Sequence, residues 1–251
     1  MKRALFSICL ILLCSAIGSA QSFTYYYPHV TSGHYPGGSW RTTIFITNST
    51  GGGNVASGVI TLTRSDGAAF NLQFVDEFNR PVGGGNTIPF QLASGETRKY
   101  ISTVTTPLAS GYATVAANAP VMGTAVFSQF DGGGRLMGEA GVPAAIPLGR
   151  QAIIVDTTNA FKTGVAIANP NAAELHINFE LMTSTGQKLM TSTRNLPPGQ
   201  HLAFFLHDLF PTAPSMVGRL QFWCTNPMVS VGLRFDPGFS LFTTLPPIAI
   251  Q

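Results

Sequence analysis

The chain has 251 residues, of which 27 are Gly, 17 are Pro and 10% are charged, with a formal net charge of +3. Many turn-forming residues and few charges are typical of an all-β protein with short strands. The charged residues are scattered singly, so the sequence lacks the basic stripe that offsets nucleic-acid phosphates, which argues against nucleic acid as a partner.

The first segment, residues 1–20, is predicted to be a signal peptide. A basic start precedes an apolar stretch over 4–17, and small residues lead up to a cleavage point after Ala20. The apolar stretch is too short for a good membrane span, and no later stretch is long enough. We therefore expect a secreted or periplasmic protein that begins near Gln21 and has no membrane span after cleavage.

Cys224 is the one cysteine left after cleavage, because Cys9 and Cys14 lie in the leader. A secreted protein without a disulfide has to be held together by apolar burial. A lone thiol can also react or bridge two chains. Cys224 continues the alternation of Leu220 and Phe222, however, so we expect it to lie in the core.

Four sequence blocks recur in the same order in the two halves of the chain. The pairs are 42–50 with 163–171, 92–101 with 196–205, 111–122 with 218–229, and 139–145 with 242–248. Chance similarity between β segments is the alternative, and four colinear blocks argue against it. We therefore expect an internal duplication, with domains at 21–148 and 149–251.

Apolar and polar residues alternate within the blocks, as they do in half-buried strands. Predicted strands of the first half lie within 42–50, 58–64, 69–74, 92–101, 111–115 and 117–127. Their counterparts lie within 163–171, 173–182, 188–193, 196–205, 218–222 and 224–235. Asn48 and Asn169 end the first of these strands, where an Asn side chain can hydrogen-bond its own turn. The one helical signal is a single turn within 207–214, with Asp208 as its N-cap.

Six or seven short antiparallel strands in about 100 residues predict an immunoglobulin-like sandwich for each half. The entry YYYPHV, the strand ends ITNS and IANP, the turns LASG and LPPG and the late strands VMGTAVF and VSVGLRF resemble bacterial secreted and surface proteins built from tandem Ig-like (fibronectin-III-like) modules. That resemblance implies a non-enzymatic structural or interaction protein of the cell exterior, in an adhesion or accessory role. Its partner would be an unknown protein or a polysaccharide.

Aromatic residues are the first candidates for a binding surface. Tyr25, Tyr26, Tyr27 and Trp40 cluster before the first strong strand, and Trp223 is out of phase with the apolar positions of its own strand. Exposed rings that stack on sugars favour a carbohydrate-binding module as the alternative function. Against this, the Tyr run can be an edge strand packed on its own sandwich, and Trp223 can lie in the contact between the domains.

The segment 75–89 is the second candidate. It contains much of the extra length of the first half, and it holds Asp76, Glu77, Asn79 and Arg80 beside a triple glycine. Loops over a rigid scaffold often carry binding residues, so we expect a flap or hairpin that contacts a ligand. A tolerated surface insertion is the alternative, because a longer loop costs little closure entropy.

The sequence gives little support for catalytic or metal-binding residues. His176, Asn178 and Glu180 share one strand face, and His201 and His207 follow on a later strand, which is one arrangement for a divalent cation. A solvated strand face produces the same pattern. No G-x-S-x-G, H-E-x-x-H or paired C-x-x-C motif occurs in the sequence. We therefore predict no catalytic residue, no metal ligand and no cofactor.

Overall fold

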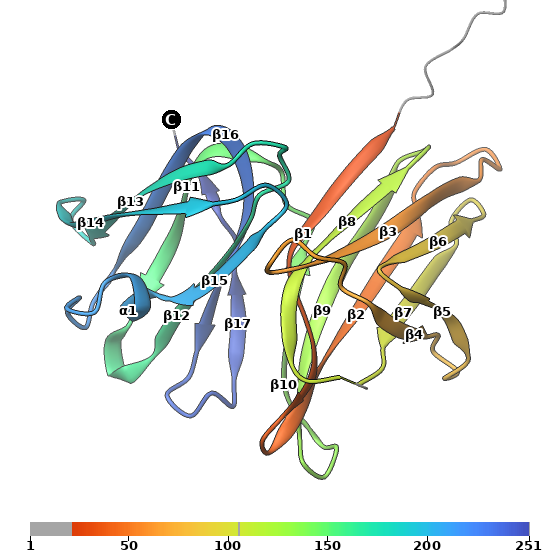
Figure 1. The fold of residues 1–251 in the computed structure, drawn as a ribbon, viewed down its shortest axis with the longest axis horizontal. Helices are drawn as coiled ribbons and strands as arrows, with labels where there is room; N and C mark the ends of the chain where they lie inside the picture. The colour runs from red at the N-terminus through yellow and green to blue at the C-terminus, as the bar shows by residue number, and fades with distance from the viewer. Residues whose placement is uncertain (1–21, 105, 251) are drawn as a thin grey trace, which may run out of the picture.

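The computed structural model describes residues 22–104 and 106–250, so the predicted signal peptide at 1–20 lies outside the described residues. The described chain is all-β, with 65% of its residues in strands and 3% in helices. Its strands form two sheets that lie side by side (Figure 1). The all-β class and the sandwich packing are therefore confirmed. Neither helical segment in the described part is long and apolar enough to cross a membrane.

The first sheet has ten strands. They are β1 (Phe23–Tyr35), β2 (Gly38–Asn48), β3 (Ala56–Arg64), β4 (Leu72–Val75), β5 (Pro81–Gly85), β6 (Thr87–Leu92), β7 (Thr97–Ser102), β8 (Ala109–Ala117), β9 (Val121–Asp131) and β10 (Leu136–Pro143). The hydrogen-bonded order is β5-β4-β7-β2-β1-β8-β3-β6, and β9 pairs with β2 and β10. Each strand predicted for this half overlaps one of these, but the hairpin partner of β3 is β6 and not the predicted strand at 69–74, which ends in β4 and pairs with β5 and β7.

Strand β1 holds the two layers of the first sheet together. It pairs with β8 over residues 23–32 and with β2 over residues 33–35. Because the two partners lie in different layers, the sheet folds over itself and encloses an apolar core. The core contains, among others, Ile44, Ile60, Phe74, Val115 and Phe127.

The second sheet has eight strands. They are β11 (Leu148–Asp156), β12 (Lys162–Ala168), β13 (Leu175–Thr183), β14 (Lys188–Leu196), β15 (His201–Phe205), β16 (Val217–Phe235), β17 (Phe242–Leu245) and β18 (Ile248–Ala249). The order is β14-β13-β16-β11-β18, while β12 pairs with β15 and β16, and β17 pairs with β16. Its core contains, among others, Ile153, Val165, Phe179, Leu220 and Phe222.

Strand β16 corrects the prediction of two separate strands at 218–222 and 224–235. It is continuous over 19 residues. Residues 217–223 pair with β11 and β13, and residues 229–235 pair with β12. Between these parts its register against β11 shifts, which marks a bulge, and a bulge bends a strand. One strand therefore serves both layers of this half.

Two short helical segments connect the strands of the second half, η1 (Thr158–Ala160) and α1 (Leu206–Leu209). The single turn expected within 207–214 is confirmed, but Asp208 is not its N-cap. Phe205 occupies the N-cap position, and the Asp208 carboxylate accepts the Phe205 N–H at 2.8 Å. Asp208 therefore occupies the N3 position of the turn and caps it as the acidic residue of a capping box does.

Aromatic rings join the two halves. Phe242 of β17 stacks on Phe127 of β9, with ring centroids 5.2 Å apart, and lies at the same distance from Trp40 of β2. Val231 and Leu233 of β16 belong to the same apolar cluster as the first core. The two halves therefore share buried apolar surface along their junction, beyond the chain connection itself.

Candidate functional site

The outer surface of the second sheet carries the most convincing candidate site. In an antiparallel sheet, side chains of directly paired residues lie side by side on one face. One row across β11, β16, β13 and β14 consists of Arg150, Trp223, Asn178 and Thr193. The next row on that face consists of Ala152, Gln221, Glu180 and Thr191. The Trp223 face is defined here by Arg150, Asn178, Glu180, Thr191, Thr193, Gln221 and Trp223.

A hollow of about 400 Å³ opens on this face, bordered by β13, β14 and the half-buried ring of Trp223. The guanidinium carbon of Arg150 lies 5.3 Å from the centre of that ring. Strands β11 and β13 flank β16 on opposite sides. Arg150 therefore holds the indole on its β11 side through a cation–π contact, and the hollow lies on its β13 side.

Polar groups converge on the hollow. Glu180 accepts hydrogen bonds from Gln221 Nε2 at 2.5 Å and from Lys188 Nζ at 3.1 Å. Both bonds lower the pKa of Glu180, and the bond from Gln221 has the larger effect. The carboxylate is therefore ionised at neutral pH. The side-chain amide of Asn178 and the hydroxyls of Thr191 and Thr193 make no hydrogen bond within the described residues, and they remain available to a ligand.

No protein-family model matches this chain, and no curated protein or solved structure is significantly similar to it.

The structure separates the other predicted aromatic residues from Trp223. The ring of Tyr27 lies in the first core with 2% of its surface exposed. Tyr25 packs against the same core, and its hydroxyl accepts a backbone N–H at 3.2 Å. Tyr26 packs in a small cluster at the junction of the halves, and Trp40 packs on phenylalanine rings of both halves. Tyr27 is buried, and the other three rings are half-buried and pack against apolar clusters, whereas the half-buried Trp223 borders a surface hollow.

A hairpin over residues 72–85 takes up most of the segment 75–89. Strands β4 and β5 are its arms, and β4 also pairs with β7, which extends the first sheet. The Asp76 carboxylate closes the tip, because it accepts the backbone N–H of Arg80 at 2.9 Å and its side chain at 2.7 Å. Glu77 and Asn79 are exposed beside this pair. Asp76, Glu77 and Arg80 border a hollow of about 440 Å³ between the hairpin and β7.

The end of that segment is not part of a surface insertion. Residues 87–89 belong to β6, which pairs with β3. The side chain of Ile88 is fully buried in the first core. Only residues 76–85, the tip and the exposed strand β5, are therefore additional to the sandwich, because β4 places Leu72 and Phe74 in the first core.

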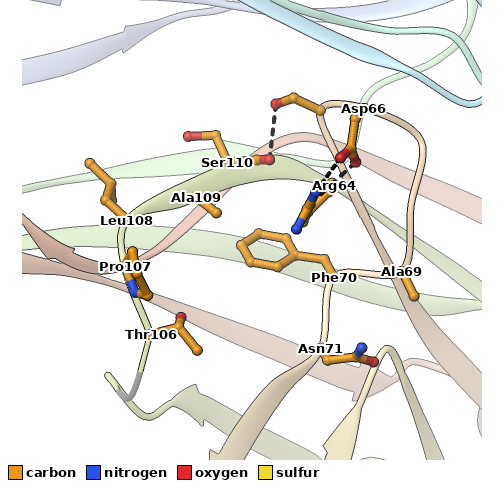
Figure 2. Close-up of a pocket in the computed structure, with 11 residues that line it drawn as sticks. Arg64, Asp66, Ala69, Phe70, Asn71, Thr106, Pro107, Leu108, Ala109 and Ser110 are labelled. Atoms are coloured by element: carbon orange, nitrogen blue, oxygen red, sulfur yellow. Dashed lines mark hydrogen bonds and ion pairs between the residues drawn. The ribbon is translucent and has the colours of Figure 1, made fainter.

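Figure 2 shows a larger hollow, of about 640 Å³, between the turn after β3 and the segment before β8. Arg64 and Asp66 form an ion pair across that turn. The pair lowers the pKa of Asp66 through the hydrogen bond from Arg64. The Ser65 hydroxyl donates to the carbonyl of Ser110 at 2.9 Å. The polar groups here mainly bond one another and hold the turn in place.

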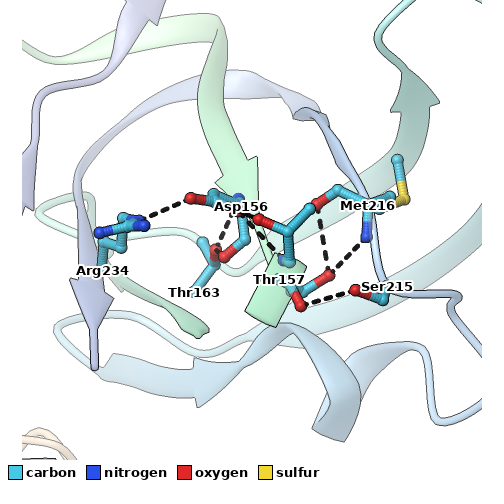
Figure 3. A network of polar contacts seen from close by, with 7 residues as sticks. Asp156, Thr157, Thr163, Ser215, Met216 and Arg234 are labelled. Carbon is cyan, nitrogen blue, oxygen red and sulfur yellow. Dashed lines mark hydrogen bonds and ion pairs between the residues drawn. The ribbon is translucent and has the colours of Figure 1, made fainter. Parts of the chain in front are cut away.

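Another polar network, at the end of β11, is also committed to the fold (Figure 3). Asp156 accepts the Thr158 hydroxyl at 2.7 Å and Arg234 Nε at 2.7 Å, and these bonds lower its pKa. The Arg234 guanidinium in turn lies 3.4 Å from the centre of the Phe161 ring. Thr163 also bonds the backbone of Asp156 at both its N–H and its carbonyl. This network ties β11 to β12 and β16.

The histidines and carboxylates considered as metal ligands do not gather. His176 is exposed on β13, and its Nδ1 atom lies 2.9 Å from Oδ1 of Asn195. His201 is buried at the junction of the halves. No group of three or more His, Cys, Asp or Glu side chains suited to a metal ion occurs in the described ranges.

A histidine pair across the junction was not predicted from the sequence. His29 Nδ1 lies 3.3 Å from His201 Nε2, and His201 Nδ1 lies 2.9 Å from the Ser65 hydroxyl. Burial lowers the pKa of His29 to about 4, and the pKa of His201 is also low, so both rings are neutral at pH 7. Because 172 positions separate the two residues, no local pattern could have revealed the pair.

Cys224 lies in the bulge of β16. Its thiol is half-buried, packs against the second core, and lies 2.8 Å from the carbonyl of Asn226. Burial raises the pKa of Cys224 to about 11. The expected core position is therefore confirmed only in part, because the side chain packs against the second core but is half-buried.

Proposed function

We propose that this chain is a secreted, non-enzymatic interaction protein of the cell exterior, built from two tandem Ig-like repeats. The repeats are supported by the recurring sequence blocks and by matching strand partners. In the first half β2 pairs with β7 and β9, and in the second half β12 pairs with β15 and the end of β16. Likewise β3 pairs with β6 and β8, and β13 pairs with β14 and the start of β16.

The Trp223 face is the observation that carries a binding role. Asp66, Asp76, Asp131 and Asp236 each accept backbone N–H groups of their own turns, so these carboxylates serve the fold. The Trp223 face instead presents an aromatic ring and amide and hydroxyl groups on a hollow. A few polar groups around an apolar contact surface are typical of ligand sites.

Carbohydrate binding is the second candidate function, and the same face favours it. A sugar ring has an apolar C–H surface and a rim of hydroxyls. An aromatic face suits the first, and amide, hydroxyl and carboxylate groups suit the second. The Tyr cluster does not add to this surface, because its rings pack within the fold.

The test is a binding experiment with the mature protein, residues 21–251. The folded protein is mixed with isolated cell-envelope material and with insoluble polysaccharides, and the bound fraction is measured after washing. We expect retention on at least one of these materials, and no release of shortened sugar or peptide products on long incubation. Failure of the folded protein to bind any of them would contradict the interaction role, and product release would contradict the non-enzymatic one.

A further inference from the structure

We propose that the hollow on the Trp223 face is a subsite for one neutral pyranose ring of a polysaccharide. This inference rests on the carbohydrate-binding candidate above and names its site and ligand class. Trp223 provides the stacking surface. Asn178, Thr191 and Thr193 provide hydrogen bonds to the sugar hydroxyls, and Glu180 accepts a further one.

The position of Trp223 on the sheet gives the stacking geometry. Its partner on one side is Arg150 and its partner on the other side is Asn178. Arg150 occupies the β11 side of the indole at 5.3 Å from its centre. A ligand in the hollow therefore meets the β13 side, with Asn178 and Thr193 in the same row beneath it. The cation–π contact also restricts the ring, which reduces the entropy that a ligand must overcome on binding.

The available polar groups match a hydroxylated ligand. Asn178 can donate and accept, and so can the hydroxyls of Thr191 and Thr193. A carboxylate has about four lone-pair positions, and Gln221 and Lys188 each take one on Glu180. A volume of about 400 Å³ lies at the small end of the range for ligand pockets, which suits one sugar ring better than a large ligand.

The charge of the hollow favours a neutral sugar. Glu180 is the one charged residue among those that line it. Lys188 is bonded to Glu180 and offsets its charge. Arg150, on the β11 side of the indole, is near enough to help lower the pKa of Glu180 and does not line the hollow. A uronate in the hollow would therefore meet the Glu180 carboxylate directly, and like charges at close range repel.

Tryptophan emission can report binding at this place directly. The chain has two tryptophans, Trp40 and Trp223. Trp40→Phe keeps an aromatic ring among Phe127 and Phe242 and leaves Trp223 as the one emitter. This variant is titrated with neutral hexasaccharides of glucose or mannose, and with an oligogalacturonate of equal length. We expect a neutral oligosaccharide to change the Trp223 emission and the oligogalacturonate to bind more weakly.

Three variants in the otherwise natural chain locate the subsite, with affinity measured by calorimetry. Trp223→Ala should weaken neutral-sugar binding about tenfold, the scale of one stacking contact. Thr193→Val, which leaves the ring in place, should weaken it several-fold. Phe239→Ala is the matched control, because Phe239 is an aromatic residue 41% exposed in the turn between β16 and β17 and does not line the hollow, so it should leave affinity unchanged. Melting curves check that each variant is folded.

The outcomes separate this subsite from the wider function. Neutral-sugar binding that survives both Trp223→Ala and Thr193→Val would overturn the subsite and leave the carbohydrate-binding function standing. Preference for the oligogalacturonate would overturn the neutral ligand class. Absence of binding to all three probes and to insoluble polysaccharides would contradict the carbohydrate-binding function itself.

Discussion

Asn48 and Asn169 are both fully buried, at the ends of β2 and β12, and they make matching hydrogen bonds. Asn48 Nδ2 donates to the carbonyls of Asn54 at 2.9 Å and Leu92 at 3.0 Å. Asn169 Nδ2 donates to those of Ala173 and Leu196 at the same two distances. Each Oδ1 accepts the backbone N–H two residues further on at 2.9 Å. Each side chain therefore ties the end of a strand to its own turn and to a strand of the other layer.

Loss of either asparagine should destabilise the fold. Asn48→Ala and Asn169→Ala each remove one donor group and one acceptor, and they leave buried backbone groups without partners. We expect each to lower the free energy of unfolding by about 1–3 kcal/mol, measured by urea denaturation. Asn54→Ala is the control, because the Asn54 amide is exposed and makes a single bond at 3.1 Å, so it should have little effect. Equal small effects in all three variants would contradict this role.

The histidine pair should make stability depend on pH. His29 Nδ1 faces His201 Nε2 at 3.3 Å, and His201 Nδ1 faces the Ser65 hydroxyl at 2.9 Å. Burial disfavours a positive charge on either ring, and two charged rings at this distance would also repel each other, so the folded protein favours the neutral pair. The pKa of His29 falls from 6.5 to about 4 in the folded protein, so the unfolded chain takes up a proton first as pH falls.

The contribution of this pair to the free energy of unfolding is therefore complete above pH 6.5, and it is lost as the pH falls from 6.5 towards 4. For His29 alone the loss is on the order of 3 kcal/mol, at about 1.36 kcal/mol for each unit of pKa. Urea unfolding between pH 4 and 8 measures it. His29→Phe should flatten the profile over this window, whereas His176→Phe, which changes an exposed ring, should not. An unaltered profile in His29→Phe would exclude the pair as the cause.

Cys224 should react slowly in the folded protein. Its raised pKa, about 11, leaves very little thiolate at pH 8, and the thiolate is the reacting form. We expect labelling by a thiol reagent to be much slower than for the same chain in urea, where the pKa returns towards its ordinary value. Cys224→Ser serves as the blank. A native protein labelled as fast as the unfolded one, or a disulfide-linked dimer under non-reducing conditions, would contradict the inward position.

The hairpin and the end of segment 75–89 should behave differently when changed. Replacing all of 75–89 by residues 192–195 (STRN) removes buried Ile88, and loss of a large buried side chain costs about 2–5 kcal/mol. Thermal melting should show that loss. Phe78→Ala at the exposed tip should change stability by less than about 0.5 kcal/mol. An unchanged melting temperature on replacement of the whole segment would show that β6 is dispensable, contrary to its place in the core. Whether the tip contacts a ligand stays a prediction.

Local patterns in the sequence determined the all-β class, most strand positions and the outward direction of Trp223. A strand has a side-chain period of two, so the phase of Trp223 against Leu220 and Phe222 is readable from the residues of that strand alone. The turn-capping role of Asn48 and Asn169 could also be predicted from the sequence. The bond between each side chain and the N–H two residues further on lies within the local turn.

Pairing between distant segments decided the rest. Whether β16 breaks at Cys224 depends on how β11, β12 and β13 pair along it. The register of those strands also sets Arg150 and Asn178 beside Trp223, and the contact between halves packs Trp40 on Phe242 and brings His29 to His201. A one-residue change of register would turn these side chains to the other face. Such registers arise from the burial of both sheets together, which no single strand specifies.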